Sequence, residues 1–120
     1  MKRKGEKTMI KLNRIKSPKL ADWYWCDKNG NFYSRRYSDI PHKIKTNTTG
    51  NGKYQIARLV KRDGTYGTFL IHRLIAETMC EKPEGKYEVD HINRNSLDNR
   101  PCNLRWVTHS ENMKNTRWSA

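Results

Sequence analysis

The sequence lacks an apolar run of about 18 residues, the length that a membrane-spanning helix requires. Its first residues also lack the apolar core of a secretory signal peptide, so we expect a cytoplasmic protein. Cysteine is scarce: Cys26, Cys80 and Cys102 lie far apart, and none belongs to a CxxC pair. An odd number of separated cysteines argues against a structural zinc site and a disulfide framework, and favours reduced thiols.

Acidic residues are few as well. The chain has 12 Asp and Glu against 25 Lys and Arg, which gives a net charge of +13 over 120 residues. Such an excess indicates a partner with dense negative charge, namely DNA, RNA or an anionic membrane surface. The length allows one domain or two small modules that share a modest core.

We divide the chain into three segments. Residues 1–20 form a basic arm with a single acid, Glu6; it is either a solvated tail or an arm that follows phosphates, and Pro18 argues against a continuous helix. Residues 21–82 are predicted to form an antiparallel sheet with a helix and to bind DNA. Residues 83–120 carry the motif described below.

Two β-hairpins are predicted in the middle segment. Asn29-Gly30 and Asp63-Gly64 are turn sequences that tolerate positive φ, and strand-like residues flank each of them. Between the hairpins, Thr46–Gly52 is predicted to be a polar loop, because it has no periodicity. The predicted strands are Asp22–Asp27, Asn31–Tyr37, Lys53–Lys61 and Thr65–Ile71.

Helical spacing of apolar residues then predicts a short helix over His72–Cys80. The final segment is predicted as strand, loop, strand and helix. The two strands are Tyr87–Ile92 and Leu104–Val107, with the polar loop Asn93–Cys102 between them. Thr108 and Glu111 match a capping box, so the last helix should begin there and run to about Trp118.

Asp90 and His91 are the residues best suited to chemistry. A carboxylate can hold a hard cation, and an adjacent imidazole can take a proton from water near neutral pH, as metal-assisted hydrolysis requires. Neighbouring side chains on a regular strand point to opposite faces, so the pair can flank one phosphate only where the strand ends or distorts. The polar loop that starts at Asn93 makes a strand end reasonable there.

The run DHINRNSLDNRPCNLRWVTHSEN (residues 90–112) resembles the motif of HNH endonucleases, in the variety found in phage and intron-encoded homing endonucleases. The resemblance covers residues 87–117, and a looser one extends over residues 31–80. It implies an α+β fold in which a small antiparallel sheet and a helix precede a ββα-metal core.

The resemblance also implies roles for individual residues. His91 would be the general base that activates water, and Asp90 and Asn112 would hold one divalent metal ion. Asn103 would hold the loop closed and so keep His91 oriented. Because Asp and Asn both offer oxygen atoms, the metal would be Mg²⁺ or Mn²⁺. Asn115, one helical turn after Asn112, is a further candidate, and no small-molecule cofactor is expected.

The implied substrate is double-stranded DNA. His72 at a helix start and Arg105 on an outward-facing strand position are candidate phosphate contacts, each with a purely structural or solvated alternative. The other candidate DNA-binding residues are basic side chains of the predicted sheet, and a two-stranded ribbon of such a sheet can enter the major groove. They are Arg35, Arg36, Lys43, Lys45, Lys53, Arg58 and Lys61.

Two rival functions stay open. The chain could be a catalytically inactive DNA-binding protein built on the same fold, or an RNA-binding protein, although aromatic ribonucleoprotein and GXXG motifs are lacking. Many longer homing enzymes continue into a helix-turn-helix, so we expect site recognition here to come from residues before Tyr87. A monomer would nick one strand and a homodimer could cut both. We expect a phage or mobile-element protein in a bacterial host.

Overall fold

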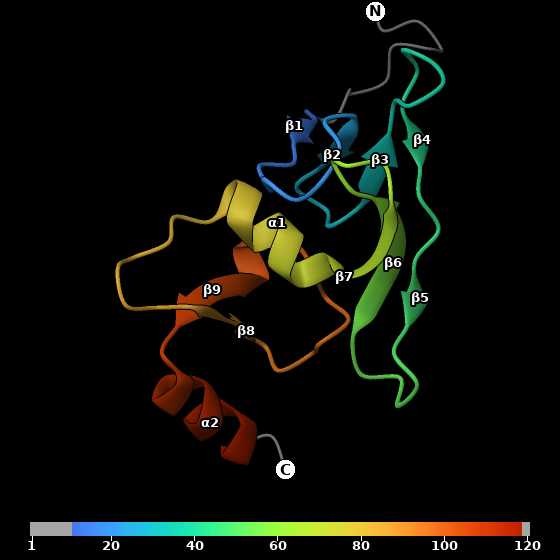
Figure 1. Cartoon of the computed structure of the whole chain (residues 1–120). Coiled ribbons are helices and arrows are strands. Elements are labelled where there is room, and N and C mark those ends of the chain that lie inside the picture. Colours follow the sequence, from blue (N-terminus) through green and yellow to red (C-terminus); the bar gives the residue numbers. More distant parts are fainter. Residues whose placement is uncertain (1–10, 119–120) are drawn as a thin grey trace, which may run out of the picture.

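The computed structural model describes residues 11–118, with side chains through residue 114, and its strands form three antiparallel sheets (Figure 1). The first sheet has the order β1 (Asn13–Arg14), β2 (Tyr24–Cys26), β3 (Phe32–Ser34) and β4 (His42–Lys43). The second has the order β5 (Asn47–Thr48), β6 (Gln55–Val60) and β7 (Tyr66–Leu70), and the third pairs β8 (Glu88–His91) with β9 (Leu104–Val107). The helices are α1 (Ile71–Met79), the 3-10 turn η2 (Pro101–Asn103) and α2 (His109–Trp118). The predicted α+β class is confirmed.

The β2–β3 hairpin forms where the Asn29-Gly30 turn predicted it, with Trp25 opposite Tyr33 and Gly30 at a φ of 84°. A buried carboxylate organises this turn. Asp27 accepts hydrogen bonds from the backbone N–H groups of Asn29 (2.9 Å) and Asn31 (3.0 Å) and from the Tyr33 hydroxyl (2.8 Å). Burial alone would raise the pKa of Asp27, but these hydrogen bonds outweigh it and hold the pKa below its usual value.

The β6–β7 hairpin is confirmed too. Its register places Arg58 opposite Thr68, and Gly64 adopts a φ of 89° in the turn. Asp63 caps this turn, since its carboxylate accepts the Thr65 backbone N–H at 3.0 Å. Glycine is needed at the turn because other residues pay a steric penalty at positive φ.

The region before α1 differs from the prediction in its short strands. We expected one small sheet, whereas two form, joined by an isolated bridge between Leu20 and Lys61. Thr46–Gly52, predicted as a loop, contains β5, which pairs with β6. Strands β1, β4 and β5 have two residues each and therefore leave no alternating pattern that the sequence could reveal.

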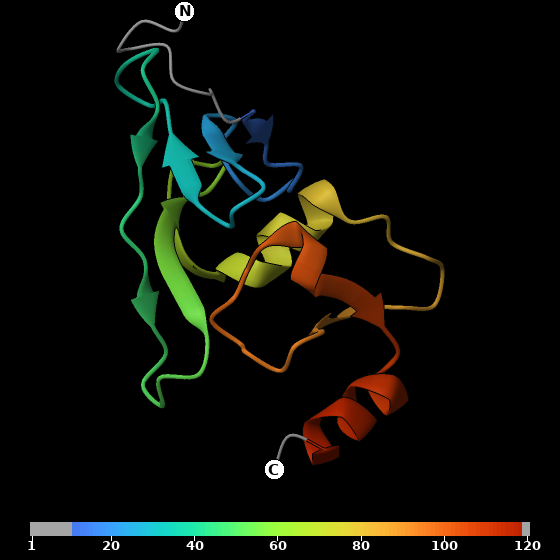
Figure 2. The same ribbon diagram turned by 180° about the vertical axis from the view of Figure 1, so that it is seen from behind.

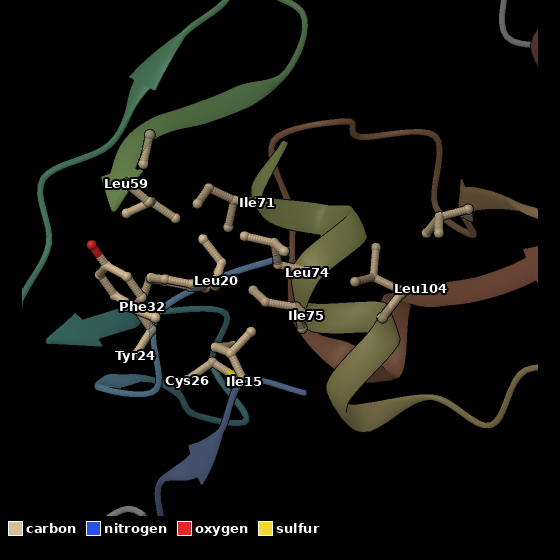
Figure 3. Close-up of a cluster of buried hydrophobic side chains, with 14 of the residues drawn as sticks. Ile15, Leu20, Tyr24, Cys26, Phe32, Leu59, Ile71, Leu74, Ile75 and Leu104 are labelled. Atoms are coloured by element: carbon tan, nitrogen blue, oxygen red, sulfur yellow. The ribbon is translucent and has the colours of Figure 1, made fainter. Parts of the chain in front are cut away.

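Helix α1 lies at the centre of the molecule, between the first two sheets and the β8–β9 hairpin. Figure 3 shows Ile71, Leu74 and Ile75 of α1 facing the sheet side, with Leu104 of β9 on the other side of the helix. Ile75 is fully buried, and burying an aliphatic side chain of this size contributes about 1.5–3 kcal/mol. The helix thus joins the N-terminal sheets to the segment that carries Asp90 and His91.

A single hydrophobic cluster contains residues from both sides of the predicted boundary at residue 82, among them Phe32 and Trp106. Of the predicted basic arm, residues 1–10 lie outside the described part of the chain. Residues 11–20 are packed into the fold: they include β1, and Ile15 and Leu20 belong to the core. The three-segment division itself stays a prediction.

Helix α2 begins with the predicted capping box. The Thr108 backbone N–H donates to Glu111 at 2.9 Å, and the Glu111 backbone N–H donates to the Thr108 hydroxyl at 3.1 Å. All three cysteines are free, and burial raises the pKa of the Cys26 thiol to about 12. Within the described residues, every helix is too short or too polar to cross a bilayer.

Candidate active site

The β8–β9 hairpin sets the positions of Asp90 and His91. Asp90 pairs with Arg105 and His91 with Leu104, and β8 ends at His91. Side chains alternate along a strand, so Glu88 and Asp90 share one face while His91 lies on the other. Asp90 and His91 are both buried, at 4% and 7% exposure. The strand end inferred from the polar loop is present, and the two side chains have different surroundings.

Asp90 is held by the residue opposite it. Both Nε (3.0 Å) and Nη2 (2.9 Å) of Arg105 donate to Oδ2 of Asp90. The Arg105 side chain is about half exposed, as expected for a residue that faces away from the core. It therefore places a positive charge beside the carboxylate, and its contact with phosphate stays a prediction.

Helix α2 supplies the next side chain. Asn112, in its second turn, donates from Nδ2 to Oε1 of Glu88 at 2.8 Å, and His109 Nδ1 lies 2.7 Å from the other oxygen of that carboxylate. The hydrogen bonds from Asn112 and His109 hold the pKa of Glu88 below its usual value. Glu88 thus links β8 to α2 on the face of the strand that also carries Asp90.

The donors on this face suit a hard cation. Asp90 offers carboxylate oxygens and Asn112 an amide oxygen, and Mg²⁺ binds through few protein oxygens while it retains water or phosphate ligands. In the described part of the chain, no cluster of three or more His, Cys, Asp or Glu side chains is arranged around a metal position. A pair of oxygen ligands completed by water and phosphate is compatible with both facts, so the residues present fit Mg²⁺ or Mn²⁺.

His91 lies in an aromatic cluster on the opposite face. Its ring centroid is 4.8 Å from that of His72 on α1 and 6.3 Å from that of Tyr54. Nε2 of His91 is 2.9 Å from Oδ1 of the buried Asn99. An amide oxygen only accepts hydrogen bonds, so Nε2 of His91 is the donor in this contact. Asn99 therefore fixes the orientation of the His91 ring.

His72, a candidate phosphate contact, is the second residue of α1 and is buried. Its ring stacks on Tyr54 at 5.2 Å. Burial, together with the nearby His91 and Arg73, lowers the pKa of His72 to about 4. The side chain is therefore neutral near pH 7, and its ring contacts that of His91; its contact with phosphate stays a prediction.

Asn103 closes the loop between the strands. Its Oδ1 accepts the Asn93 backbone N–H at 2.9 Å, and its Nδ2 donates to the Asp98 carbonyl at 2.9 Å. Its backbone carbonyl accepts the Ile92 N–H at 2.8 Å. Arg100 donates twice to Asp98 at 2.8 Å and holds the pKa of that carboxyl well below its usual range. These are the loop contacts that the predicted role of Asn103 requires, and its effect on His91 remains to be tested.

Most of the predicted DNA-binding residues of the sheets lie on or near β4, β5 and β6, which run along one edge of the molecule (Figure 2). Arg36 lies over the Trp23 ring at 5.1 Å, and Arg58 lies over the Tyr66 ring at 5.2 Å. The exposed members are Arg36, Lys43, Lys45, Lys53 and Arg58, while Arg35 and Lys61 are partly buried. The side chain of Asn115 lies outside the described residues.

Three site residues were not predicted from the sequence. Asn99 contacts His91, Glu88 contacts Asn112, and His109 contacts Glu88. Only the polar run before Pro101 hinted at Asn99. Glu88 could have been noticed from its position two residues before Asp90, because strand alternation puts both on one face.

Residues 69–114 match the family model described as HNH endonuclease. DNA endonuclease I-HmuI of Bacillus phage SP01 is 43% identical over 93 residues, which cover 77% of this chain and 50% of the relative. The uncharacterized HNH endonuclease L247 of Acanthamoeba polyphaga mimivirus is 54% identical over 46 residues, 37% of this chain and 12% of the relative. The chain thus spans half or less of the length of these relatives.

The fold has a matching solved structure, which concerns DNA binding and cleavage by the HNH homing endonuclease I-HmuI. The TM-score is 0.70 at 29% identity, and the match covers 92% of this chain and 59% of the other. The residues matched by the family model include β8, β9 and the first turns of α2. Residues 69–114 therefore match the HNH endonuclease family, and the chain is homologous to a phage homing endonuclease.

Proposed function

We propose that the protein is a metal-dependent endonuclease that hydrolyses a phosphodiester bond in double-stranded DNA. One observation carries the proposal: β8 presents the oxygen donor Asp90 on the same face as Glu88, which binds Asn112 of α2, and β8 ends at His91, whose Nε2 contacts Asn99. The similarity to I-HmuI supports DNA as the substrate.

In this proposal His91 accepts a proton from the attacking water at Nδ1, while Asn99 holds the ring through Nε2. Asp90 and Asn112 would hold one Mg²⁺ or Mn²⁺. When bound, such an ion polarises the scissile phosphate and stabilises charge on the leaving oxygen. Asn103 keeps the loop after His91 closed through its hydrogen bonds to Asn93 and Asp98.

The test compares the wild type with His91→Ala on duplex DNA. We expect the wild type to cut or nick only when Mg²⁺ or Mn²⁺ is added, and the variant to lose cleavage by at least about 100-fold, the usual contribution of a positioned base. DNA binding and thermal melting are the controls for misfolding. Both proteins should bind DNA equally and melt at similar temperatures.

Equal cleavage by His91→Ala would remove His91 from the mechanism. DNA binding by the wild type without cleavage at any divalent metal concentration would instead favour the inactive DNA-binding protein. Gel electrophoresis of supercoiled DNA after cleavage also shows how many strands are cut, because a nick and a double-strand break give different products.

A further inference from the structure

The contact between Glu88 and Asn112 decides which end of the Asn112 amide faces the candidate metal position. The donor is Nδ2 of Asn112 and the acceptor is Oε1 of Glu88, at 2.8 Å. Glu88 lies on β8 and Asn112 on α2, 24 residues apart in the sequence, so the contact depends on the fold.

Chemistry fixes the orientation of this amide. A glutamate is ionised near neutral pH, and a carboxylate only accepts hydrogen bonds. The amide NH₂ of Asn112 must therefore be the group that faces Glu88, and its oxygen lies at the opposite end. An amide on a solvated helix surface could rotate by 180° and offer a cation its NH₂, which cannot act as a ligand.

A contact between His109 and the second carboxylate oxygen of Glu88 holds the carboxylate in place. His109 Nδ1 lies 2.7 Å from Oε2, and His109 is the first residue of α2. Glu88 is thus held between two side chains of one helix. Partners of this kind, which orient metal ligands without touching the metal, commonly change metal affinity by about 10–100-fold when they are mutated.

We propose that Glu88 is a positioning residue, which binds the NH₂ group of Asn112 and so directs Oδ1 of Asn112 toward a divalent cation shared with Asp90. This inference rests on the proposed function, because it needs Asn112 to be a ligand. It assigns no contact between Glu88 and the metal ion.

A double-mutant cycle tests the inference. Mn²⁺ affinity is measured on the full chain without DNA, from the electron paramagnetic resonance signal of unbound Mn²⁺. The proteins are the wild type, Glu88→Ala, Asn112→Ala and the double variant. We expect each single change to weaken Mn²⁺ binding about 10-fold, and the double variant to match Asn112→Ala alone, since a residue that acts through Asn112 is silent without it.

Two further variants separate positioning from a structural tether. His109→Ala removes the other contact of Glu88 and leaves Asn112 in place, so Mn²⁺ affinity should fall less than in Glu88→Ala. If Glu88→Ala unfolds, Glu88→Gln serves instead, because its neutral amide no longer forces one orientation and should weaken binding by a smaller factor. Thermal melts without metal show whether a variant is folded.

Unchanged Mn²⁺ affinity in folded Glu88→Ala would overturn the inference and leave the proposed function standing. Equal losses from Glu88→Ala with and without Asn112 would also overturn it, because Glu88 would then act on the cation directly through its charge or as a ligand. Failure of the wild type to bind Mn²⁺ or to cleave DNA with it would count against the proposed function, and the inference would fall with it.

Discussion

His72 is a buried, neutral histidine whose Nδ1 has no hydrogen-bond partner among the described residues. Burial, followed by the influence of His91 and Arg73, lowers its pKa to about 4. In the unfolded chain the same side chain should titrate near the ordinary histidine value of about 6.5. The unfolded state therefore binds a proton at a higher pH than the folded state does.

This difference predicts how stability depends on pH. Folding lowers the pKa of His72, so protonation of this side chain favours the unfolded state. The free energy of unfolding is therefore unaffected by His72 above pH 6.5 and decreases as the pH falls from there toward 4. Between pH 7 and pH 5, the free energy of unfolding should drop by about 2 kcal/mol through this residue. Urea denaturation at a series of pH values measures the drop.

The control is a variant with an aromatic ring at position 72 that cannot bind a proton. His72→Phe should show a flatter dependence over the same range, whereas the change of an exposed histidine, His42→Gln, should leave the wild-type slope. A wild-type slope in His72→Phe would show that other groups cause the acid sensitivity.

At the scale of elements, the turn of the β2–β3 hairpin packs directly on the loop of the β8–β9 hairpin. A Cβ atom added at Gly30 would lie 2.8 Å from the Asn99 carbonyl carbon and 3.0 Å from the Arg100 nitrogen. Gly64 has a similar positive φ, but nothing lies within 4 Å of its added Cβ. An alanine at Gly64 would therefore introduce backbone strain alone, whereas an alanine at Gly30 would add a steric clash with the loop that contains Asn99.

We predict that Gly30→Ala impairs both stability and cleavage. Gly64→Ala should cost about 1–2 kcal/mol, the usual penalty for a side chain in the left-handed region. Gly30→Ala should cost more, because the backbone of Asn99 has to move, and cleavage should slow since Asn99 contacts His91. Urea denaturation and single-turnover cleavage rates measure the two effects; equal losses in both variants would contradict the coupling.

The same elements show what the sequence can predict. The two hairpins with Asn-Gly and Asp-Gly turns, helix α1 and the capping box of α2 all have local signals, and all are present. Strand β5 has no such signal, because its pairing with β6 depends on where the preceding chain returns. Local patterns therefore predict single elements better than how those elements pair.

For the candidate site, the motif was sufficient to select Asp90, His91, Asn103 and Asn112, and their roles are still to be tested. It was insufficient for Glu88 and Asn99. Each of these makes contacts that exist only after folding: Glu88 on β8 contacts Asn112 on α2, and Asn99 contacts His91 from within an irregular loop. Supporting residues of this kind depend on geometry more than on spacing.

At the scale of the whole molecule, the net charge of +13 is not confined to the candidate site. Lys43, Lys45, Lys53 and Arg58 are exposed along the β4–β6 edge, and the loop carrying Lys82 lies on the opposite side of the molecule in Figure 1. Ser96, from the loop after His91, donates a hydrogen bond to the Lys53 carbonyl. This contact joins the basic edge to the candidate active site, so one duplex could meet both.

The basic edge predicts a salt-dependent affinity for DNA. Removing one basic side chain that neutralises a phosphate should reduce the slope of log affinity against log salt concentration by about 0.9. Changing Lys43, Lys45, Lys53 and Arg58 together to glutamine should therefore lower the slope by between about 3 and 4 if each contacts a phosphate, and weaken binding to every sequence. Fluorescence anisotropy without divalent metal, at several salt concentrations, measures this salt dependence without cleavage.

Lys82→Gln is the matched control, and its slope should equal that of the wild type. An unchanged slope in the fourfold variant would mean that DNA binds elsewhere on the molecule.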